Sequence, residues 1–395
     1  MEKPKIRFER FEKRWKSYRL REYSNYRRGS FPQPYGNKEW YGGENAMPFV
    51  QVVDVLDNLQ LATDTKQKIS ALAQPLSVFV PSDSVIVTLQ GSIGRVAVTQ
   101  YDAYVDRTIL VFENYILKTN KDFWAYVIHN KFEIERQKAP GGTIKTITKE
   151  SLSDFKVSIP DYLEQSAIGS LFRNLDDLLA SYKDNLANYQ SLKATMLSKM
   201  FPKAGQIVPE IRLDKFEGEW EEKEFSKLVK RVTQSSDSDS LPKVEFEDII
   251  SSQGRLNKDI SSKFDNRKGI HFKPGYTLYG KLRPYLNNWL LPKFEGVALG
   301  DFWVFDPNGN DSNFIYFLIQ SNRYQKVAND TSGTKMPRSD WKSVSSTIFA
   351  IPQTIAEQQA VGSYFSNIDN FINSYQEKIS QIETLKKKLL QDMFI

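Results

Sequence analysis

Two stretches of this sequence repeat one another, 193 residues apart and without a gap. Residues Glu164–Phe201 return as Glu357–Phe394, and fifteen of the thirty-eight aligned positions are identical, where chance gives about two. The segments upstream also open alike, with Pro4–Phe8 (PKIRF) echoed by Pro209–Leu213 (PEIRL). A long internal repeat fixes the organisation before any single motif does. We predict a first globular region (1–160), a first long helix (161–204), a second globular region (205–352) and a second long helix (353–395).

Each repeated stretch carries the pattern of one long amphipathic helix. Apolar residues recur at steps of three and four, which places them on a single stripe. Prolines stand only at the margins, at Pro160, Pro202 and Pro352. A stripe of this length needs a partner along its whole extent, and the matching stripe of the same chain is the obvious one. We expect antiparallel pairing through Leu175, Leu178, Tyr182, Leu186 and Tyr189 of the first helix and Ile368, Phe371, Tyr375, Ile379 and Ile382 of the second.

Antiparallel pairing would relate the two halves by a pseudo-two-fold axis and hold the globular regions apart. The alternative is that each helix packs on its own globular region or on a second chain. Asp176 and Asp369 match between the copies, and we interpret them as solvated or capping side chains.

The two globular regions both alternate short β-like runs with turns. The predicted strands of the first are Phe49–Val53, Val78–Val80, Val85–Leu89, Arg95–Val98 and Ile109–Phe112, followed by a helix over Asp122–Gln137. Those of the second are Tyr276–Tyr279, Trp289–Leu291 and Phe302–Phe305, followed by a helix over Ser312–Asn329. A Gly-Thr turn comes next in each, at Gly142 and Gly333. The fold class predicted is therefore α+β, with two domains of related mixed plan joined by the paired helices. Their middle portions hardly align, which suggests two related domains adapted to different targets.

Composition narrows the chemistry. The 395 residues include no cysteine, which excludes disulfides and cysteine-ligated zinc, and the two histidines cannot build a histidine-rich metal site. The net charge of +6 barely favours a nucleic-acid partner by itself. The basic residues are clustered, however, in Lys13–Arg28, Lys263–Arg283 and Lys335–Lys342.

Several polar segments are candidates for DNA contact. Lys281–Asn288 combines cations, amides and an aromatic residue in one short stretch, and such side chains suit phosphates and base edges. Gly91–Arg95 is either a phosphate-binding turn or a plain hairpin turn, and it has neither the ending nor the helix of a P-loop. The predicted DNA-binding residues are Arg27, Arg28, Ser92, Arg95, Lys145, Lys281, Arg283, Asn287, Lys335 and Arg338.

No catalytic constellation recurs in the two halves. Carboxylates are plentiful without the spacing of an acid–base pair, and neither a Gly-rich S-adenosylmethionine loop nor a Walker motif is present. We predict no catalytic residue, no metal site and no cofactor in this chain.

The chain resembles the specificity (S) subunit of type I restriction–modification systems. The resemblance rests on the Ile-Pro-…-Glu-Gln-X-Ala-[Ile/Val]-Gly pattern at Ile159–Gly169 and Ile351–Gly362, and on the tandem helices that end in Met-Phe. The Ile-Arg-[Phe/Leu]…Phe…Trp openings that reach Trp15 and Trp220 are also typical of the family, as are the segments Gly91–Arg95 and Lys281–Pro284. It covers essentially the whole chain.

The resemblance implies two target recognition domains, each reading one half of a bipartite double-stranded DNA site. It also implies that the paired helices set the spacer and dock two modification (methyltransferase) subunits. Those partners would supply S-adenosylmethionine binding and adenine methylation, and restriction/translocase subunits would supply Mg- and ATP-dependent translocation and cleavage.

Two alternatives remain open at this point. One is a metal-dependent endonuclease with an unrecognised site, and the other is a structural coiled-coil dimeriser that never meets DNA. The N-terminal sequence has no signal-peptide core, and no apolar run is long enough to span a membrane. We therefore expect a cytoplasmic protein.

Overall fold

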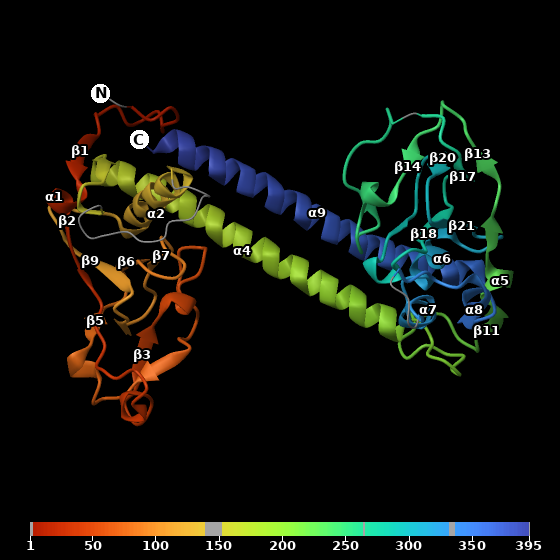
Figure 1. Cartoon of the computed structure of the whole chain (residues 1–395), viewed down its shortest axis with the longest axis horizontal. Coiled ribbons are helices and arrows are strands. Elements are labelled where there is room, and N and C mark those ends of the chain that lie inside the picture. Colours follow the sequence, from red (N-terminus) through yellow and green to blue (C-terminus); the bar gives the residue numbers. More distant parts are fainter. Residues whose placement is uncertain (1–2, 139–151, 264, 332–335, 395) are drawn as a thin grey trace. The chain divides into compact units, whose positions relative to one another are not determined.

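The computed structural model describes residues 3–138, 152–263, 265–331 and 336–394. It divides into two compact units (Figure 1). The first unit comprises Met1–Lys183 with Lys378–Ile395, and the second comprises Asp184–Glu377. Each unit therefore holds one globular region together with a portion of both long helices.

The first globular region is built from two four-stranded sheets. One sheet has the order β2-β9-β6-β7 and the other the order β4-β3-β8-β5, while β1 and β10 form a separate antiparallel pair. The strands are β1 (Lys16–Arg19), β2 (Ser24–Arg28), β3 (Met47–Val50), β4 (Gln67–Ile69), β5 (Val78–Val80), β6 (Val85–Thr88), β7 (Val96–Val98), β8 (Ala103–Val105), β9 (Ile109–Tyr115) and β10 (Lys156–Ile159). The helices are α1 (Leu20–Tyr23) and α2 (Lys121–Lys138), with 3₁₀ turns η1 (Lys38–Trp40), η2 (Val52–Asp54) and η3 (Gln74–Leu76).

The second globular region also has two four-stranded sheets, of order β12-β21-β18-β19 and β13-β17-β20-β14, beside the pairs β11-β22 and β15-β16. Its strands are β11 (Glu221–Glu224), β12 (Lys230–Val232), β13 (Ser235–Ser236), β14 (Lys243–Val244), β15 (Ile249–Ile250), β16 (Arg255–Leu256), β17 (Gly269–Phe272), β18 (Thr277–Gly280), β19 (Trp289–Leu290), β20 (Gly296–Ala298), β21 (Phe302–Asp306) and β22 (Ile348–Ile351). The helices and turns are α5 (Phe225–Leu228), η5 (Phe246–Asp248), η6 (Pro284–Leu286), α6 (Ser312–Leu318), α7 (Asn322–Ala328) and α8 (Trp341–Ser345).

The two regions share a topology that their middle sequences conceal. Strands β2, β9, β6 and β7 correspond in order and antiparallel pairing to β12, β21, β18 and β19. In the second sheets, β3-β8-β5 corresponds to β14-β20-β17, with the same parallel pair at β3-β8 and β14-β20. The extra strand lies at opposite edges, β4 beside β3 and β13 beside β17. The α+β fold class with two related domains is therefore confirmed.

The central strands alternate between two apolar layers, as the two-residue period of a strand requires. In β6, Val85 and Val87 belong to the cluster that contains α2 and the long helices, whereas Ile86 belongs to the cluster between the two sheets. In β18, Tyr279 likewise belongs to the cluster that contains the long helices, and Leu278 belongs to the cluster between the two sheets. Each globular region is thereby joined to its helices through a continuous core.

In two predicted elements the regular structure ends several residues earlier than expected. The strand predicted over Phe49–Val53 ends at Val50, because the Asp54 carboxylate accepts a hydrogen bond from the Gln51 N–H and closes the turn η2. The helix predicted over Ser312–Asn329 is two helices, since the Ser321 side chain accepts from the Tyr324 N–H and starts α7 afresh.

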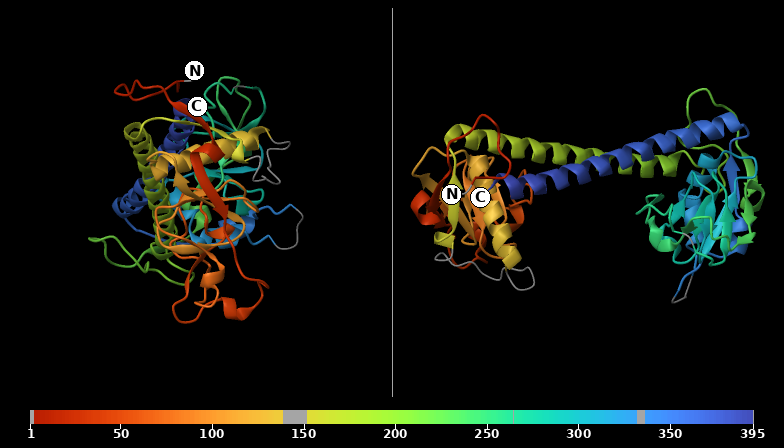
Figure 2. Two further views of the ribbon diagram at one scale, coloured as in Figure 1. Left: turned by 90° about the vertical axis from the view of Figure 1, so that its left-hand side faces the viewer. Right: turned by 90° about the horizontal axis from the view of Figure 1, so that it is seen from above.

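The repeated stretches form the long helices α4 (Tyr162–Lys199) and α9 (Ile355–Met393) (Figures 1 and 2). Within the first unit, Lys386 pairs with Asp176 and Lys183 pairs with Glu383. Within the second, Lys193 pairs with Asp369, and the Tyr189 ring stacks on Phe371 at 5.0 Å. In both units, residue numbers increase along α4 while the numbers of the residues that contact it on α9 decrease. The helix segments therefore pair antiparallel.

The predicted pairing residues differ in their burial. Ile368 and Ile379 are buried, Leu175 and Leu186 pack against the apolar cores, and Tyr189 also stacks on Tyr375 at 5.7 Å. Phe371 is 50% exposed despite its stacking contact, and Leu178 is 39% exposed. Tyr182 and Ile382 are half-buried, with Lys378 lying over the Tyr182 ring.

The prediction that Asp176 and Asp369 are solvated or capping residues was wrong. The Asp176 side chain is 5% exposed, and it accepts hydrogen bonds from Lys386 and the Tyr126 hydroxyl. Asp369 is 20% exposed and lies 2.7 Å from the Lys193 ammonium. Both acids and both lysines are repeat partners, because 369 − 176 and 386 − 193 each equal 193. Burial raises the pKa of Asp369, and Lys193 partly opposes this.

The openings of the repeat hold the starts of the long helices. Glu164 in the first turn of α4 is almost fully buried and receives two hydrogen bonds from the Arg7 guanidinium, at 2.6 and 2.7 Å. The Trp15 indole N–H donates to the same carboxylate at 3.2 Å. In the second unit, Arg212 and Trp220 make the equivalent bonds to Glu357. The Arg, Trp and Glu of the repeated motifs therefore form the same hydrogen-bonded group in both units, and this group fixes the start of each long helix.

The Gln and Gly of the repeat have an equally specific role. Gln165 accepts from the Asn120 N–H, just before α2, and donates to the Pro160 carbonyl. A Cβ on Gly169 would lie 2.4 Å from the Asn120 side-chain oxygen and 2.9 Å from the Phe123 nitrogen. Glycine at this position lets α4 pass directly over the start of α2. Gln358 and Gly362 meet the start of α6 in the same manner.

Candidate nucleic-acid interface

Two of the predicted DNA-binding residues of the second globular region, Lys281 and Arg338, meet at one aspartate. Asp301 lies after Gly300 in the turn between β20 and β21, and its carboxylate is 2.9 Å from the Arg338 guanidinium and 3.6 Å from the Lys281 ammonium. The Lys281 N–H donates to the Asp301 carbonyl, and the Ser339 N–H donates to the Lys281 carbonyl. Segments far apart in the sequence thus present two cations where β18 ends and β21 begins, which we call the cationic edge.

Arg283 adds a third cation to this edge. Its N–H donates to the Pro337 carbonyl at 2.7 Å, while its side chain is exposed and has no ion pair among the described residues. Arg283 and Asn287 both adopt left-handed backbone conformations at the ends of η6, with φ of 49° and 53°. The Asn287 amide donates to the Ser252 hydroxyl at 3.2 Å, which ties the loop to the segment after η5.

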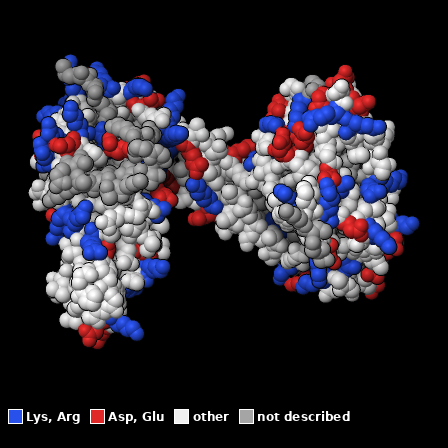
Figure 3. Space-filling view, viewed as in Figure 1, with Lys and Arg blue, Asp and Glu red and all other residues white. Residues whose placement is uncertain are grey.

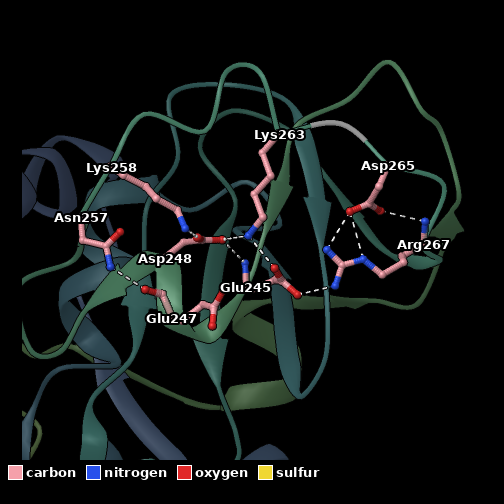
Figure 4. A network of polar contacts seen from close by, with 8 residues as sticks. All are labelled: Glu245, Glu247, Asp248, Asn257, Lys258, Lys263, Asp265 and Arg267. Carbon is pink, nitrogen blue, oxygen red and sulfur yellow. Dashed lines mark hydrogen bonds and ion pairs between the residues drawn. The ribbon is translucent and has the colours of Figure 1, made fainter.

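A second polar group in this region was not predicted (Figure 4). Lys263 contacts the Glu245 carboxylate at 2.5 Å and the Asp248 carboxylate at 2.7 Å, and Lys258 lies 2.9 Å from Asp248. Arg267 joins Glu245, at 2.5 Å, to Asp265, at 2.7 Å. We call these six residues the ion-pair network. Its only signal in the sequence was the basic run that begins at Lys263.

The ion-pair network fixes the charge state of its members. Hydrogen bonds from Arg267 and then Lys263 lower the pKa of Glu245. Burial alone would raise the pKa of Asp248, but the hydrogen bonds it accepts, led by that from Lys263, outweigh burial and lower it. The network is therefore ionised at neutral pH and is neutral in sum, with three acids against three bases.

The corresponding residues of the first globular region are more dispersed. Arg95 in the loop between β6 and β7 is 2.9 Å from the Asp57 carboxylate and donates to the Val55 carbonyl at 3.3 Å. Ser92 is exposed in the same loop, and its carbonyl accepts from the Thr88 hydroxyl. Gly91–Arg95 is thus the turn of a β-hairpin, whose strands pair at Val85–Val98 and Val87–Val96.

Arg27 and Arg28 lie on a different element from the hairpin turn. Arg27 in β2 is 2.6 Å from the Glu113 carboxylate of β9, and Arg28 is exposed at the end of the strand. Lys145 and Lys335, together with the Gly142 and Gly333 turns, lie outside the described residues. The assignment of all these residues to DNA binding stays a prediction.

Charge is distributed differently on the two regions (Figure 3). On the face shown, Lys and Arg alternate with Asp and Glu over much of the second region, whereas the part of the first region farthest from the helices is largely uncharged. In the described part of the chain, no three His, Asp or Glu side chains are grouped to hold a metal ion. Nor does any described helix have the length and apolar character needed to cross a bilayer.

Each unit also has a hollow beside its pair of helix segments. The hollow of the first unit measures about 470 Å³ and includes Asp176, Leu179 and Leu390 in its lining. That of the second measures about 370 Å³ and includes the repeat partners Asp369, Ile372 and Leu197. The repeat thus builds the same surface feature twice. Lys183 and Glu383 of the first hollow correspond to Gln376 and Gln190 of the second.

Comparison with known proteins agrees with this architecture. The family model for the type I restriction modification DNA specificity domain matches residues 12–188 and 219–384. Among solved structures, the S subunit of a type I restriction–modification system from M. genitalium aligns over 100% of this chain and 99% of its own, with a TM-score of 0.64 and 13% identity. A chain from a study of complex assembly and conformational transition of the type I restriction–modification system aligns over 96% and 97%, with a TM-score of 0.52 and 12% identity. With two matched copies of the domain covering most of its length, this chain belongs to the type I restriction–modification DNA specificity family.

Proposed function

We propose that this chain is the DNA-recognition subunit of a type I restriction–modification complex and is itself non-catalytic. Each globular region reads one half of a bipartite duplex site. The observation that carries this proposal is the shared topology of the two regions, combined with different side chains on corresponding loops. Such a pair suits two unlike half-sites better than one palindrome.

The cations of the second region suit the sugar–phosphate backbone. Lys281, Arg283 and Arg338 carry three positive charges against the single negative charge of Asp301. Exposed Lys and Arg side chains position a protein on DNA through phosphates and make binding depend on salt. In the first region, Arg28, Ser92 and Arg95 take the corresponding role.

The paired helices set the spacer and dock two modification subunits. Two corresponding hollows, one in each unit, support docking of two copies of one partner. A structural neighbour comes from a study of complex assembly in the type I restriction–modification system, which supports assembly of this chain into a complex. Restriction/translocase subunits complete the complex in the cytoplasm. S-adenosylmethionine, ATP and Mg are expected in those partners and not in this chain.

Methylome sequencing tests the proposal directly. Cells that express this chain with its cognate modification subunits are expected to carry methyladenine at one bipartite motif. Lys281→Ala should weaken recognition of a single half-site and so reduce methylation, because the residue belongs to one region only. Methylation that ignores sequence, or a loss that affects both halves alike, would contradict the division of labour.

A further inference from the structure

The turns η2 and η5 are corresponding elements that the sequence comparison did not align. Each follows a strand that pairs in parallel, β3 with β8 and β14 with β20. Each ends on a buried aspartate, Asp54 at 3% exposure and Asp248 at 0%. The Asp54 carboxylate accepts from the Gln51 N–H at 2.8 Å, and the Asp248 carboxylate accepts from the Glu245 N–H at 2.8 Å.

Further bonds hold both turns rigid. The other Asp54 carboxylate oxygen accepts from the Lys66 N–H at 2.8 Å, and its carbonyl accepts from Ala62. Asp248 is held by Lys258 and Lys263 of the ion-pair network, and its carbonyl accepts from Asn257. Elements fixed in this way can present a side chain to a ligand with little loss of entropy.

The middle residue of each turn points its side chain into solvent. Val53 is 60% exposed, although the chain buries most of its valines. Its counterpart Glu247 is exposed too, and the only contact drawn to it in Figure 4 is from the Asn257 amide to its backbone carbonyl, at 2.5 Å. No fold requirement explains an apolar residue at one of these positions and an acid at the other.

Both turns lie beside the loops that carry the predicted DNA-binding residues. A Cβ on Gly91 would be 3.4 Å from the Val52 side chain, and a Cβ on Gly280 would be 2.8 Å from the Phe246 ring. Ser92 follows the first glycine and Lys281 follows the second. A duplex held by these loops would therefore meet the middle residues of the turns.

The surface beside Glu247 is hollowed, and both charged and apolar residues line the hollow. A hollow of about 670 Å³ is lined by Glu245, Phe246, Glu247, Arg267, Lys268, Leu299 and Gly300. Gly300 precedes Asp301, which holds Lys281 and Arg338, so the hollow adjoins the cationic edge. Because the ion-pair network beside it is neutral in sum, the hollow adds little to charge-driven binding and can serve sequence discrimination instead.

We propose that the middle residue of this turn is a base-reading position in both regions, which rests on the proposed function. Val53 contacts the methyl group of a thymine. Glu247 accepts a hydrogen bond from the exocyclic amine of a cytosine or an adenine. These are the pairings that major-groove chemistry gives to an apolar and to an acidic side chain. One position of one fold thus selects different bases in the two halves.

The test is selection from duplexes with randomised half-sites, using the full chain assembled with its modification subunits. Glu247→Val should change the preferred base at one position of one half-site by about tenfold or more, and leave the other half-site unchanged. Val53→Glu should act in the same way on the opposite half-site. Leu72→Glu, a 58% exposed apolar residue elsewhere in the first region, and Glu222→Val, an exposed acid in β11, are matched controls that should change neither preference.

The outcomes separate this inference from the proposed function. Unchanged preferences in both variants, or an equal loss over all sequences with an unaltered melting temperature, would overturn the inference alone. A wild-type complex without any base preference would overturn the proposed function itself. Glu247→Gln supplies a second test. An amide can both donate and accept hydrogen bonds, so this variant should broaden the base preference without changing the volume of the side chain.

Discussion

At the residue scale, burial decided what the repeated acids do. Their place on long helices predicts that Asp176 and Asp369 are solvated or capping residues, because the sequence alone offers no measure of burial. The repeat did contain a usable clue, since Lys193 and Lys386 are repeat partners as well. Two acids and two lysines in one antiparallel register can form the same ion pair twice.

The ion-pair network gives a prediction at this scale. Lys263→Met should reduce the free energy of unfolding by about 3 kcal/mol, because it leaves the fully buried Asp248 with Lys258 as its only cationic partner. Lys258 is 51% exposed, and Lys258→Met should cost about 1 kcal/mol or less. Urea unfolding of both variants measures the difference. Equal effects would show that Lys263 is not the principal counter-ion.

The same network predicts a response to pH. The pKa values of Glu245 and Asp248 are lowered in the folded chain from ordinary values of 4.5 and 3.8. Groups of this kind stabilise the fold above their unfolded pKa, and this stability is lost as the pH falls through the folded pKa. The melting temperature should therefore fall below about pH 4, and more steeply in the wild type than in Lys263→Met. Melting curves between pH 3 and pH 7 provide the measurement.

At the scale of elements, the long helices are held by contacts that recur in the repeat. Their existence followed from periodicity, and their pairing followed from the need to cover the stripe. The antiparallel direction was predicted because it relates the two halves by a pseudo-two-fold axis. The roles of Glu164, Gln165 and Gly169 did not follow, because each contacts a residue distant in sequence. The shared family motif is thus explained as an anchor for the helix.

A mutation of the glycine tests the anchor. Gly169→Ala should destabilise the chain by about 2 kcal/mol, because its methyl group would overlap the Asn120 oxygen and the Phe123 nitrogen at the start of α2. Ser170→Ala, at the next and exposed position, should have almost no effect. Thermal unfolding followed by circular dichroism compares the two. A neutral Gly169→Ala would mean that α4 can move away from α2 at no cost.

The buried ion pair between the helices provides a second test at this scale. Lys386→Met should cost about 3 kcal/mol by leaving Asp176 without its counter-ion. The combination with Asp176→Asn should cost less than the sum of the single changes, with a coupling of about 1–3 kcal/mol. Lys183→Met breaks the exposed pair with Glu383 and should cost about 0.5 kcal/mol or less. Strict additivity of the first two changes would argue against a direct interaction.

At the scale of the whole molecule, the chain is a duplicated design whose halves have diverged in their loops. The repeat of the hollows beside the helices predicts that two modification subunits bind one chain. Native mass spectrometry of the assembled complex should give a ratio of two to one. Leu179→Glu, in the lining of the first hollow, should reduce this to one to one, whereas a ratio unaffected by that change would place the docking surface elsewhere.

The sequence by itself determined the repeat, the two long helices with their antiparallel pairing, and the kinship with specificity subunits. These properties follow from periodicity and repetition, which are local or can be read by aligning the chain with itself. Only the tertiary structure brought Lys281, Asp301 and Arg338 together, buried Asp176, and matched Val53 with Glu247. The physical reason is that strand order decides which distant loops become neighbours, and strand order depends on packing that no short stretch of sequence encodes.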